Sequence, residues 1–309
     1  MTLVLFGLFF LFMLLGVPIA FAIGASSLYA LYQSGVPLMV VTQQMFQGIN
    51  SFALVAIPMF ILAGDLMAQG KVSERLVSFA DSLVGFMRGG LSVVSVMAGM
   101  FFAAISGSGA ATTAAVGSSL VPELKRKGYD PASAASLIAA SGTIGVVIPP
   151  SVPMIIYAVI AQQSVSSLFL NGFLPGLAMG IALMAIAITQ AYKRKYPKGT
   201  PLSLDTIWRT LKAASWGLMT PVIILGGIFS GIFTPSEAAV VAVNYALLVS
   251  LFVYRDLTLP QVYKLLIRSA MTTAVIMLVI AMSAVLSWTL SSWQVPGAIA
   301  QAVLSLSTN

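Results

Sequence analysis

The sequence contains no cysteine and no histidine. Disulfides, thiolate nucleophiles, imidazole bases and the usual zinc sites are therefore excluded. A membrane-embedded hydrolase that pairs a serine with a histidine is excluded for the same reason. We accordingly expect no enzymatic activity from this chain.

Charge is scarce as well. Only 7% of the 309 residues are charged and 59% are hydrophobic, whereas a soluble domain has about 25% charged residues. Residues 1–53 and 131–192 contain no charged side chain, and a bilayer span needs only about 20 mostly apolar residues. The composition predicts an all-α integral membrane protein surrounded by lipid. Its net charge of +7 then indicates basic cytoplasmic loops rather than nucleic-acid binding.

Apolar runs separated by helix breakers predict nine segments. Residues 131–163 are long for one span, and Gly142, Gly145 and the pair Pro149-Pro150 interrupt them, so we predict a broken helix there. Residues 72–86 and 256–267 are predicted to be amphipathic helices at the membrane interface. The nine apolar segments are 2–15, 17–33, 53–69, 92–121, 131–163, 167–192, 214–233, 235–254 and 268–291.

The basic residues indicate how residues 92–121 meet the membrane. If this segment crossed once, Arg88 and the cluster 125–127 would lie on opposite faces, contrary to the positive-inside rule. A re-entrant hairpin that enters and returns places all the basic clusters on one side. Its tip would be 106–109, because glycine and serine tolerate a non-helical turn. Each half has about 14 residues, roughly 20 Å of helix, which reaches only the middle of the bilayer.

A faint internal repeat is also present. The sequence around Gly16-Val17-Pro18 resembles that around Phe233-Thr234-Pro235, and residues 51–69 resemble 269–287. The charge pattern makes these two longer segments run in opposite directions across the membrane. An inverted repeat of this kind is typical of secondary transporters.

The two interrupted elements, 101–113 and 142–151, are the candidate binding elements. An interruption frees backbone carbonyls and helix ends, and such carbonyls together with hydroxyls suit Na⁺, whereas helix N-termini suit a carboxylate. The alternative is that glycine and serine only permit close helix packing. We interpret Glu237 as part of an N-terminal capping box with Thr234, and Asp65 as a side chain that reaches the interface.

The same motifs resemble those of a known family. ISGSGAATTAAVGSSLVPELKRKGYD at 105–130 and AASGTIGVVIPPS at 139–151 resemble the large membrane subunit of TRAP (tripartite ATP-independent periplasmic) transporters. GVPIAFA at 16–22, IPMFILAG at 57–64 and GIFTPSEAAVVAV at 231–243 fit the same family. The resemblance covers essentially the whole chain in order.

The resemblance implies a bacterial inner-membrane, multi-pass importer of carboxylates such as sialic acid or C4-dicarboxylates, driven by Na⁺. Its partners would be a small four-helix membrane subunit and a periplasmic substrate-binding protein. It also implies an inverted-repeat, elevator-type fold with a re-entrant helical hairpin. The implied Na⁺ residues are Ser106, Ser108, Gly109, Gly142, Gly145, Ile148 and Pro149. The implied substrate residues are Ser108, Ala110, Thr112, Thr113, Thr143 and Ser151.

The expected organisation has four parts. Residues 1–91 would hold the scaffold spans and interfacial arm helix of a first repeat, and 92–166 the hairpin and broken helix of the transport domain. Residues 167–213 would be a span and cytoplasmic linker, and 214–309 the scaffold of a second repeat. Family members continue into a second hairpin and broken helix, so we expect the chain alone not to transport. A channel or a non-transporting structural subunit remains the alternative.

Overall fold

The computed structural model describes residues 1–199 and 201–306. Regular structure in these residues is helical, apart from an isolated β-bridge between Arg88 and Lys198. Five of the described helices are long and apolar enough to cross a membrane, or six spans when one bent helix pair is counted. The prediction of an all-α, multi-pass membrane protein is confirmed. The chain divides into two compact units, Met1–Ser51 with the residues from Ala270 onward, and Phe52–Ser269.

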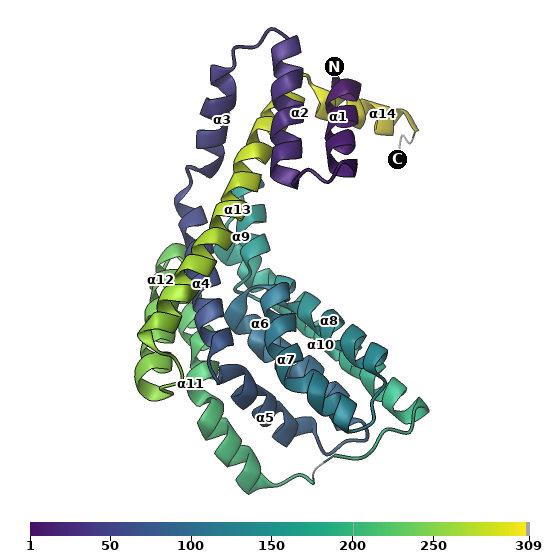
Figure 1. The fold of residues 1–309 in the computed structure, drawn as a ribbon, viewed down its shortest axis with the longest axis vertical. Coiled ribbons are helices and arrows are strands. Elements are labelled where there is room, and N and C mark those ends of the chain that lie inside the picture. The colour runs from purple at the N-terminus through teal and green to yellow at the C-terminus, as the bar shows by residue number, and fades with distance from the viewer. Residues whose placement is uncertain (200, 307–309) are drawn as a thin grey trace. The chain divides into compact units, whose positions relative to one another are not determined.

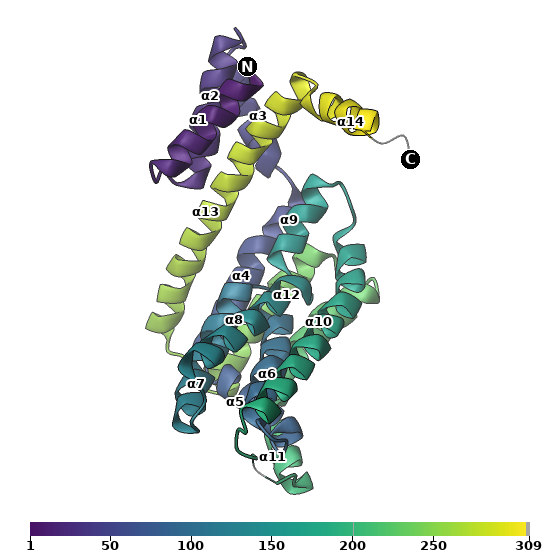
Figure 2. The same cartoon turned by 90° about the vertical axis from the view of Figure 1, so that its right-hand side faces the viewer.

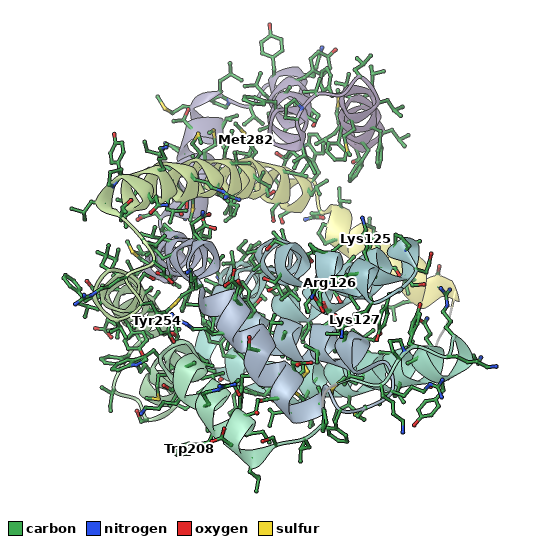
Figure 3. The ribbon with its side chains drawn as sticks, turned by 60° about the horizontal axis from the view of Figure 1, so that its bottom comes forward. Lys125, Arg126, Lys127, Trp208, Tyr254 and Met282 are labelled. Carbon is green, nitrogen blue, oxygen red and sulfur yellow. The ribbon has the colours of Figure 1, made fainter. Side chains whose placement is uncertain are left out.

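The first unit contains α1 (Thr2–Leu14), α2 (Ile19–Gln33), α3 (Met39–Ile49), the later part of α13 (Leu259–Ser292) and α14 (Val295–Leu306). A turn at Gly16, whose φ is +77°, separates α1 from α2 at the predicted boundary. Helix α3 was not predicted, because its polar residues (Thr42, Gln43, Gln44 and Gln47) interrupt the apolar pattern. Gly24 of α2 lies against Met282 of α13, which Figure 3 labels.

The second unit contains the interrupted elements. Figures 1 and 2 show α6, α7 and α8 side by side, and α6 also packs against α5 and α10. The core lies along α6, in which most side chains from Val93 to Ile105 are buried. The helices are α4 (Ala56–Gln69), α5 (Val72–Val84), α6 (Gly90–Ser106), α7 (Gly109–Arg126), α8 (Pro131–Val147), α9 (Val152–Ile160), α10 (Val165–Lys193), α11 (Leu204–Phe229) and α12 (Pro235–Leu248).

The predicted hairpin is present as α6 and α7. The two helices are 17 and 18 residues long, about 26 and 27 Å at 1.5 Å per residue. Helix α7 is longer than predicted because it continues beyond the apolar run, past Glu123, to Arg126. Helix α6 begins at Gly90, two residues before the predicted segment. Gly107 joins them with a φ of +61°, a conformation that favours glycine. The re-entrant position of this hairpin in the bilayer stays a prediction.

The predicted broken helix is present as α8 and α9. The two helices bend by 42° at residues 148–151, which include both prolines. Proline lacks the backbone N–H that the helical ladder needs, so α8 ends just before the pair. The second proline then stands two residues before α9, whose first residue is Val152.

Two predicted boundaries were wrong. Residues 256–267 do not form a separate interfacial helix, because α13 continues from Leu259 to Ser292 without a break. Arg268 and Ser269 lie within it, and neither residue type breaks a helix as proline does. Helix α11 begins at Leu204 rather than at residue 214. Its first turns contain Asp205, Arg209 and Lys212, so they do not form an apolar run in the sequence.

Three loops at the open end of the hairpin are joined. The rings of Tyr129 and Tyr196 stack with centroids 4.0 Å apart. Arg194 pairs with Asp130 at 3.2 Å, and Arg88 Nε donates to the carbonyl of Tyr196 at 3.1 Å. The start and end of the hairpin are therefore tied to the end of α10. This brings the basic residues 88, 125–127 and 193–195 to one end of the second unit; Figure 3 labels 125–127 at the end of α7. The membrane face on which the basic clusters lie stays a prediction.

Candidate ion and substrate site

The hairpin tip and the break in the broken helix touch each other. The backbone N–H of Val152, the first residue of α9, donates to the carbonyl oxygen of Gly107 at 3.2 Å. The contact leaves no room for a side chain at the tip, because a Cβ on Gly107 would lie 2.5 Å from the carbonyl oxygen of Pro150. Four helix ends meet here: the C-termini of α6 and α8 and the N-termini of α7 and α9.

Three oxygen atoms cluster beside the tip. Thr112 Oγ1 lies 3.0 Å from Ser106 Oγ and donates to the carbonyl oxygen of Ser108 at 2.8 Å. Ser106 Oγ also donates to the Ser108 carbonyl at 3.3 Å. Ser106 and Thr112 are 1% and 0% exposed, so the cluster is shielded from solvent. Hydroxyl and carbonyl oxygens are hard ligands of the kind that alkali and alkaline-earth cations prefer.

Helix α8 closes this oxygen cluster from the other side. A Cβ on Gly145 would lie 2.7 Å from Thr112 Oγ1 and 3.1 Å from the Ser108 carbonyl oxygen. One turn earlier, Gly142 lies against Thr113 Oγ1, and its carbonyl oxygen would be 2.9 Å from a Cβ on Gly109. Both predicted glycines of α8 therefore give the hairpin's oxygen atoms direct access to the α8 backbone.

The two helix N-termini at the junction are capped by serines. Ser108 Oγ accepts from the N–H of Ala111 at 3.3 Å, and Ser151 Oγ accepts from the N–H of Met154 at 3.5 Å. Ser151 is also bonded across the break, where its hydroxyl donates to the carbonyl of Val146 at 2.6 Å. Helix N-termini carry partial positive charge and bind anions. The junction thus combines donors for an anion with oxygen ligands for a cation.

The predicted substrate residues fall into two groups. Ala110 and Thr143 are exposed, and Ser108 and Thr113 are half-buried, so these four reach an open face of the junction. Thr112 and Ser151 are fully buried and face the interior instead. The hydroxyl of Thr143 donates to the carbonyl of its own helix at Ala140, at 2.7 Å. The assignment of all six to a substrate stays a prediction.

The remaining predicted ion residues lie at the end of α8. Ile148 is buried, and Gly176 of α10 packs against its side chain and backbone. Pro149 is buried beside it. These two residues border the break but contribute no side-chain oxygen. Any part that they play in holding an ion must come from their carbonyl groups.

Gly64 of α4 contacts the hairpin tip, and this contact was not predicted from the sequence. A Cβ on Gly64 would lie 3.0 Å from both the Cα and the carbonyl oxygen of Ser106. The signal was present as a lone glycine in the apolar motif at 57–64. Without coordinates, nothing links that glycine to the hairpin tip.

The carboxylates of Glu237 and Asp65 have hydrogen-bond partners within the fold. Thr234 and Glu237 form the predicted capping box: the Glu237 carboxylate accepts from the Thr234 N–H at 2.8 Å, and Thr234 Oγ1 accepts from the Glu237 N–H at 3.3 Å. Asp65 accepts from the hydroxyl of Ser269 at 2.8 Å. Neither side chain belongs to the junction.

Comparison with known proteins gives a consistent result. The family model for the tripartite ATP-independent periplasmic transporter, DctM component, matches residues 6–309. The chain is 42% identical over 309 residues to the isethionate TRAP transporter permease protein DctMQ of Oleidesulfovibrio alaskensis, covering 99% of this chain and 48% of that protein.

Two C4-dicarboxylate TRAP transporter large permease proteins, each named DctM, are also similar. The protein of Rhodobacter capsulatus is 37% identical over 315 residues, covering 97% of this chain and 72% of the relative. The protein of Pseudomonas aeruginosa is 43% identical over 263 residues, covering 85% and 62%. The chain thus spans between 48% and 72% of the lengths of these three relatives.

Proposed function

The chain belongs to the DctM component family of tripartite ATP-independent periplasmic transporters, and we propose that it acts in the large membrane subunit of a Na⁺-coupled importer of small carboxylates. Sialic acid and C4-dicarboxylates are the substrate classes we favour, since relatives in the family carry those names. The proposed location is the bacterial inner membrane. The proposed partners are a small four-helix membrane subunit and a periplasmic binding protein that delivers the substrate.

The observation that carries this proposal is the hydrogen bond from Val152 to Gly107. It joins the two interrupted elements at the point where four helix ends meet. Interrupted helices of this kind form the substrate and ion sites of many secondary transporters, because their free backbone groups lie at the middle of the membrane. A site made of backbone and hydroxyl groups also fits a chain with no histidine and few carboxylates.

In this proposal Na⁺ is held between the tip and the break. The ligands would be the Ser106 hydroxyl, the carbonyl of Ser108 and the freed carbonyls near the ends of α6 and α8. Thr112, assigned to the substrate from the family resemblance, fits the ion better, because its hydroxyl lies within the oxygen cluster. The ion would hold the tip against α8, and the carboxylate would then bind at the open face beside Ala110 and Thr143.

The proposed movement is that of an elevator. The loops tied by Tyr129 and Tyr196 connect both ends of the hairpin to α10. These contacts favour a hairpin that moves with its neighbours as one body rather than opening by itself. In this movement the whole site, with its bound ion and substrate, would cross the bilayer.

The ion site can be tested without transport, by thermal unfolding of the purified chain in detergent. We expect Na⁺ to raise the midpoint over choline at equal ionic strength, saturably, because ligands stabilise the state that binds them; 100 times the Kd gives about 2.7 kcal/mol. The double variant Ser106→Ala/Ser108→Ala should lose this response. Ser141→Ala is the control, because Ser141 is as buried as Ser106 but donates to Ile138 in its own helix. Equal midpoints in Na⁺ and choline would refute the ion site.

The coupling requires the assembled transporter. Counterflow of labelled C4-dicarboxylate or sialic acid should be measured in proteoliposomes that contain the full-length large subunit, the small subunit and the binding protein. Uptake should depend on a Na⁺ gradient and should fall in the double variant. Uptake that is unchanged when Na⁺ is removed would contradict Na⁺ coupling, and a conductance without substrate would favour a channel.

A further inference from the structure

A basic cavity lies between α5 and the first turns of α11, away from the hairpin tip. Its volume is about 300 Å³. Arg75 and Ser78 line it from one face of α5, since residues spaced by three or four share a helix face, and Lys71 lines it from just before that helix. Arg209 and Thr210 line it from α11, and Glu74 adds the one carboxylate. Three cationic side chains against one anionic side chain give this cavity a positive charge.

Arg75 is fixed in the wall of this cavity. Its guanidinium carbon lies 3.4 Å from the centre of the Tyr254 ring, a cation–π contact. The Tyr254 hydroxyl in turn donates to the carbonyl of Ala213, another lining residue, at 2.8 Å. Stacking on a ring restrains the guanidinium plane and leaves its N–H groups available to an acceptor.

One of those N–H groups lacks an acceptor among the described residues. The Nη1 atom of Arg75 is buried and has no hydrogen-bond partner there. A buried guanidinium nitrogen without a partner is costly, so an acceptor is expected at this place. Asp256 does not line the cavity, and its Oδ2 accepts from the backbone N–H of Lys71 at 2.7 Å. Its Oδ1 is buried and also has no hydrogen-bond partner among the described residues. The three cationic side chains that line the cavity suit an oxyanion, because arginine forms strong charge-assisted hydrogen bonds with phosphate oxygens.

The start of α11 indicates which kind of oxyanion the cavity would bind. Leu204 and Trp208 are 81% and 70% exposed on the turns just before Arg209; Figure 3 shows Trp208 at the outer edge of α11. Exposed tryptophan at the end of a span marks the depth of the lipid headgroups. Basic cavities at that depth bind anionic headgroups, and the apolar side chains beside them accommodate acyl chains.

We infer that the cavity between α5 and α11 binds the phosphate of an anionic phospholipid, with Arg75 and Arg209 as its main cationic contacts. The hydroxyls of Ser78 and Thr210 supply further donors to the phosphate oxygens. Two or more cations favour cardiolipin or phosphatidylglycerol over a zwitterionic lipid, whose own ammonium group the arginines repel. This site is separate from the proposed transport site and uses none of its residues.

The test is lipid binding to the purified, delipidated chain in detergent, followed by native mass spectrometry and by thermal unfolding. Cardiolipin and phosphatidylglycerol should bind and raise the unfolding midpoint by several degrees, whereas phosphatidylcholine should not. Arg209→Gln, on an exposed side chain, should weaken cardiolipin binding at least fivefold, and Arg75→Gln at least tenfold. Lys125→Gln is the control: it removes an exposed basic residue at the end of α7 and should bind as the wild type does.

Inorganic phosphate separates the possible sources of the oxyanion. We expect it to compete only weakly, because it lacks acyl chains; full competition at millimolar concentration would assign the cavity to a soluble phosphate and overturn the lipid. An equal loss in Arg209→Gln and Lys125→Gln would show non-specific attraction to a basic surface. Loss of small-subunit capture in Arg209→Gln, with lipid binding intact, would assign the cavity to that protein partner. None of these readouts involves Na⁺ or carboxylate, so they stand or fall separately from the proposed function.

Discussion

Gly64 of α4 packs directly against the backbone of Ser106 at the tip of the hairpin. A Cβ at residue 64 would lie 3.0 Å from both the Cα and the carbonyl oxygen of Ser106. The oxygen cluster at the hairpin tip therefore has close backbone neighbours on α4, at Gly64, and on α8, at Gly145. The oxygen cluster of Ser106, Ser108 and Thr112 is held between two helix surfaces that lack side chains at the point of contact.

Replacing Gly64 with alanine should displace the tip. Adding a methyl group to such a contact costs about 1–3 kcal/mol, and the part of the structure that must shift carries Ser106. We expect Gly64→Ala to lower the unfolding midpoint by a few degrees and to raise the Na⁺ concentration for half-maximal stabilisation several-fold. Thermal unfolding in a Na⁺ titration measures both. The control is Gly226→Ala in α11, where a Cβ would meet nothing within 4 Å; equal behaviour of the two variants would contradict the prediction.

The variant Thr112→Val tests the contribution of the Thr112 hydroxyl separately from the packing of the side chain. Valine keeps the shape but removes the Oγ1 atom that bonds to Ser106 and Ser108. We expect a loss of about 1–2 kcal/mol, because the buried Ser106 hydroxyl loses a partner, together with a Na⁺ affinity at least tenfold lower. Thr112→Ser retains the hydroxyl and should keep most of the Na⁺ response. If valine destabilises the chain but leaves the Na⁺ titration unchanged, Thr112 is structural and the ion lies elsewhere.

The sequence predicted the places where helices are interrupted, because those places are determined locally. The turn at residue 107 has a left-handed φ that glycine adopts readily, and the pair Pro149-Pro150 removes two backbone donors. Both breaks can therefore be predicted from the residue types alone. The same holds for the cap at Thr234 and Glu237, whose partners are three residues apart. The helix α3 was missed because its glutamines obscure an apolar face that becomes clear only against Val285 and Leu31.

The site itself could be predicted only in part. Ser106 and Thr112 are six residues apart and lie on opposite sides of a turn, so their contact depends on the geometry of that turn. The role of Gly64 depends on a contact across more than forty residues of sequence. The prediction of a separate interfacial helix at 256–267 was wrong for a different, local reason: the charged residues Lys264 and Arg268 interrupt the apolar pattern, but the helix continues through them.

The capping box at the start of α12 should contribute to stability and not to transport. Thr234→Ala removes the acceptor for the N–H of Glu237, and loss of such a cap costs about 0.5–2 kcal/mol. Thr234→Ser should be nearly neutral, because serine caps equally well. Glu237→Gln should leave uptake and its Na⁺ dependence unchanged, since glutamine can occupy the same position in the motif. Abolished uptake by a well-folded Glu237→Gln variant would show that this carboxylate has a transport role.

The stability of the loop between α7 and α8 should depend on pH through the carboxylate of Asp130. The backbone N–H of Ser133 donates to its carboxylate at 2.9 Å and Arg194 pairs with it at 3.2 Å, and these contacts, the backbone hydrogen bond first, lower the pKa of Asp130. Because the pKa of Asp130 is lower in the folded state, its carboxylate stabilises the fold fully when the pH is above the pKa of the unfolded state, about 3.9. This stabilisation is lost as the pH falls through the pKa of the folded state. The side chain is solvent-exposed, so the contribution is small. We therefore expect the wild type to unfold at a slightly higher temperature than Asp130→Asn at pH 7, with the difference vanishing as the pH falls below about 4.

The variant Asp130→Asn suits this measurement because asparagine still caps α8 while it cannot form the ion pair. Arg194→Gln provides the complementary control: it should lower the midpoint at pH 7 and leave a smaller acid-dependent difference, since the hydrogen bond from Ser133 remains. Thermal unfolding of the three proteins between pH 7 and pH 3 gives the comparison. A difference between wild type and Asp130→Asn that persists unchanged at pH 3 would show that the carboxylate charge is not what stabilises the loop.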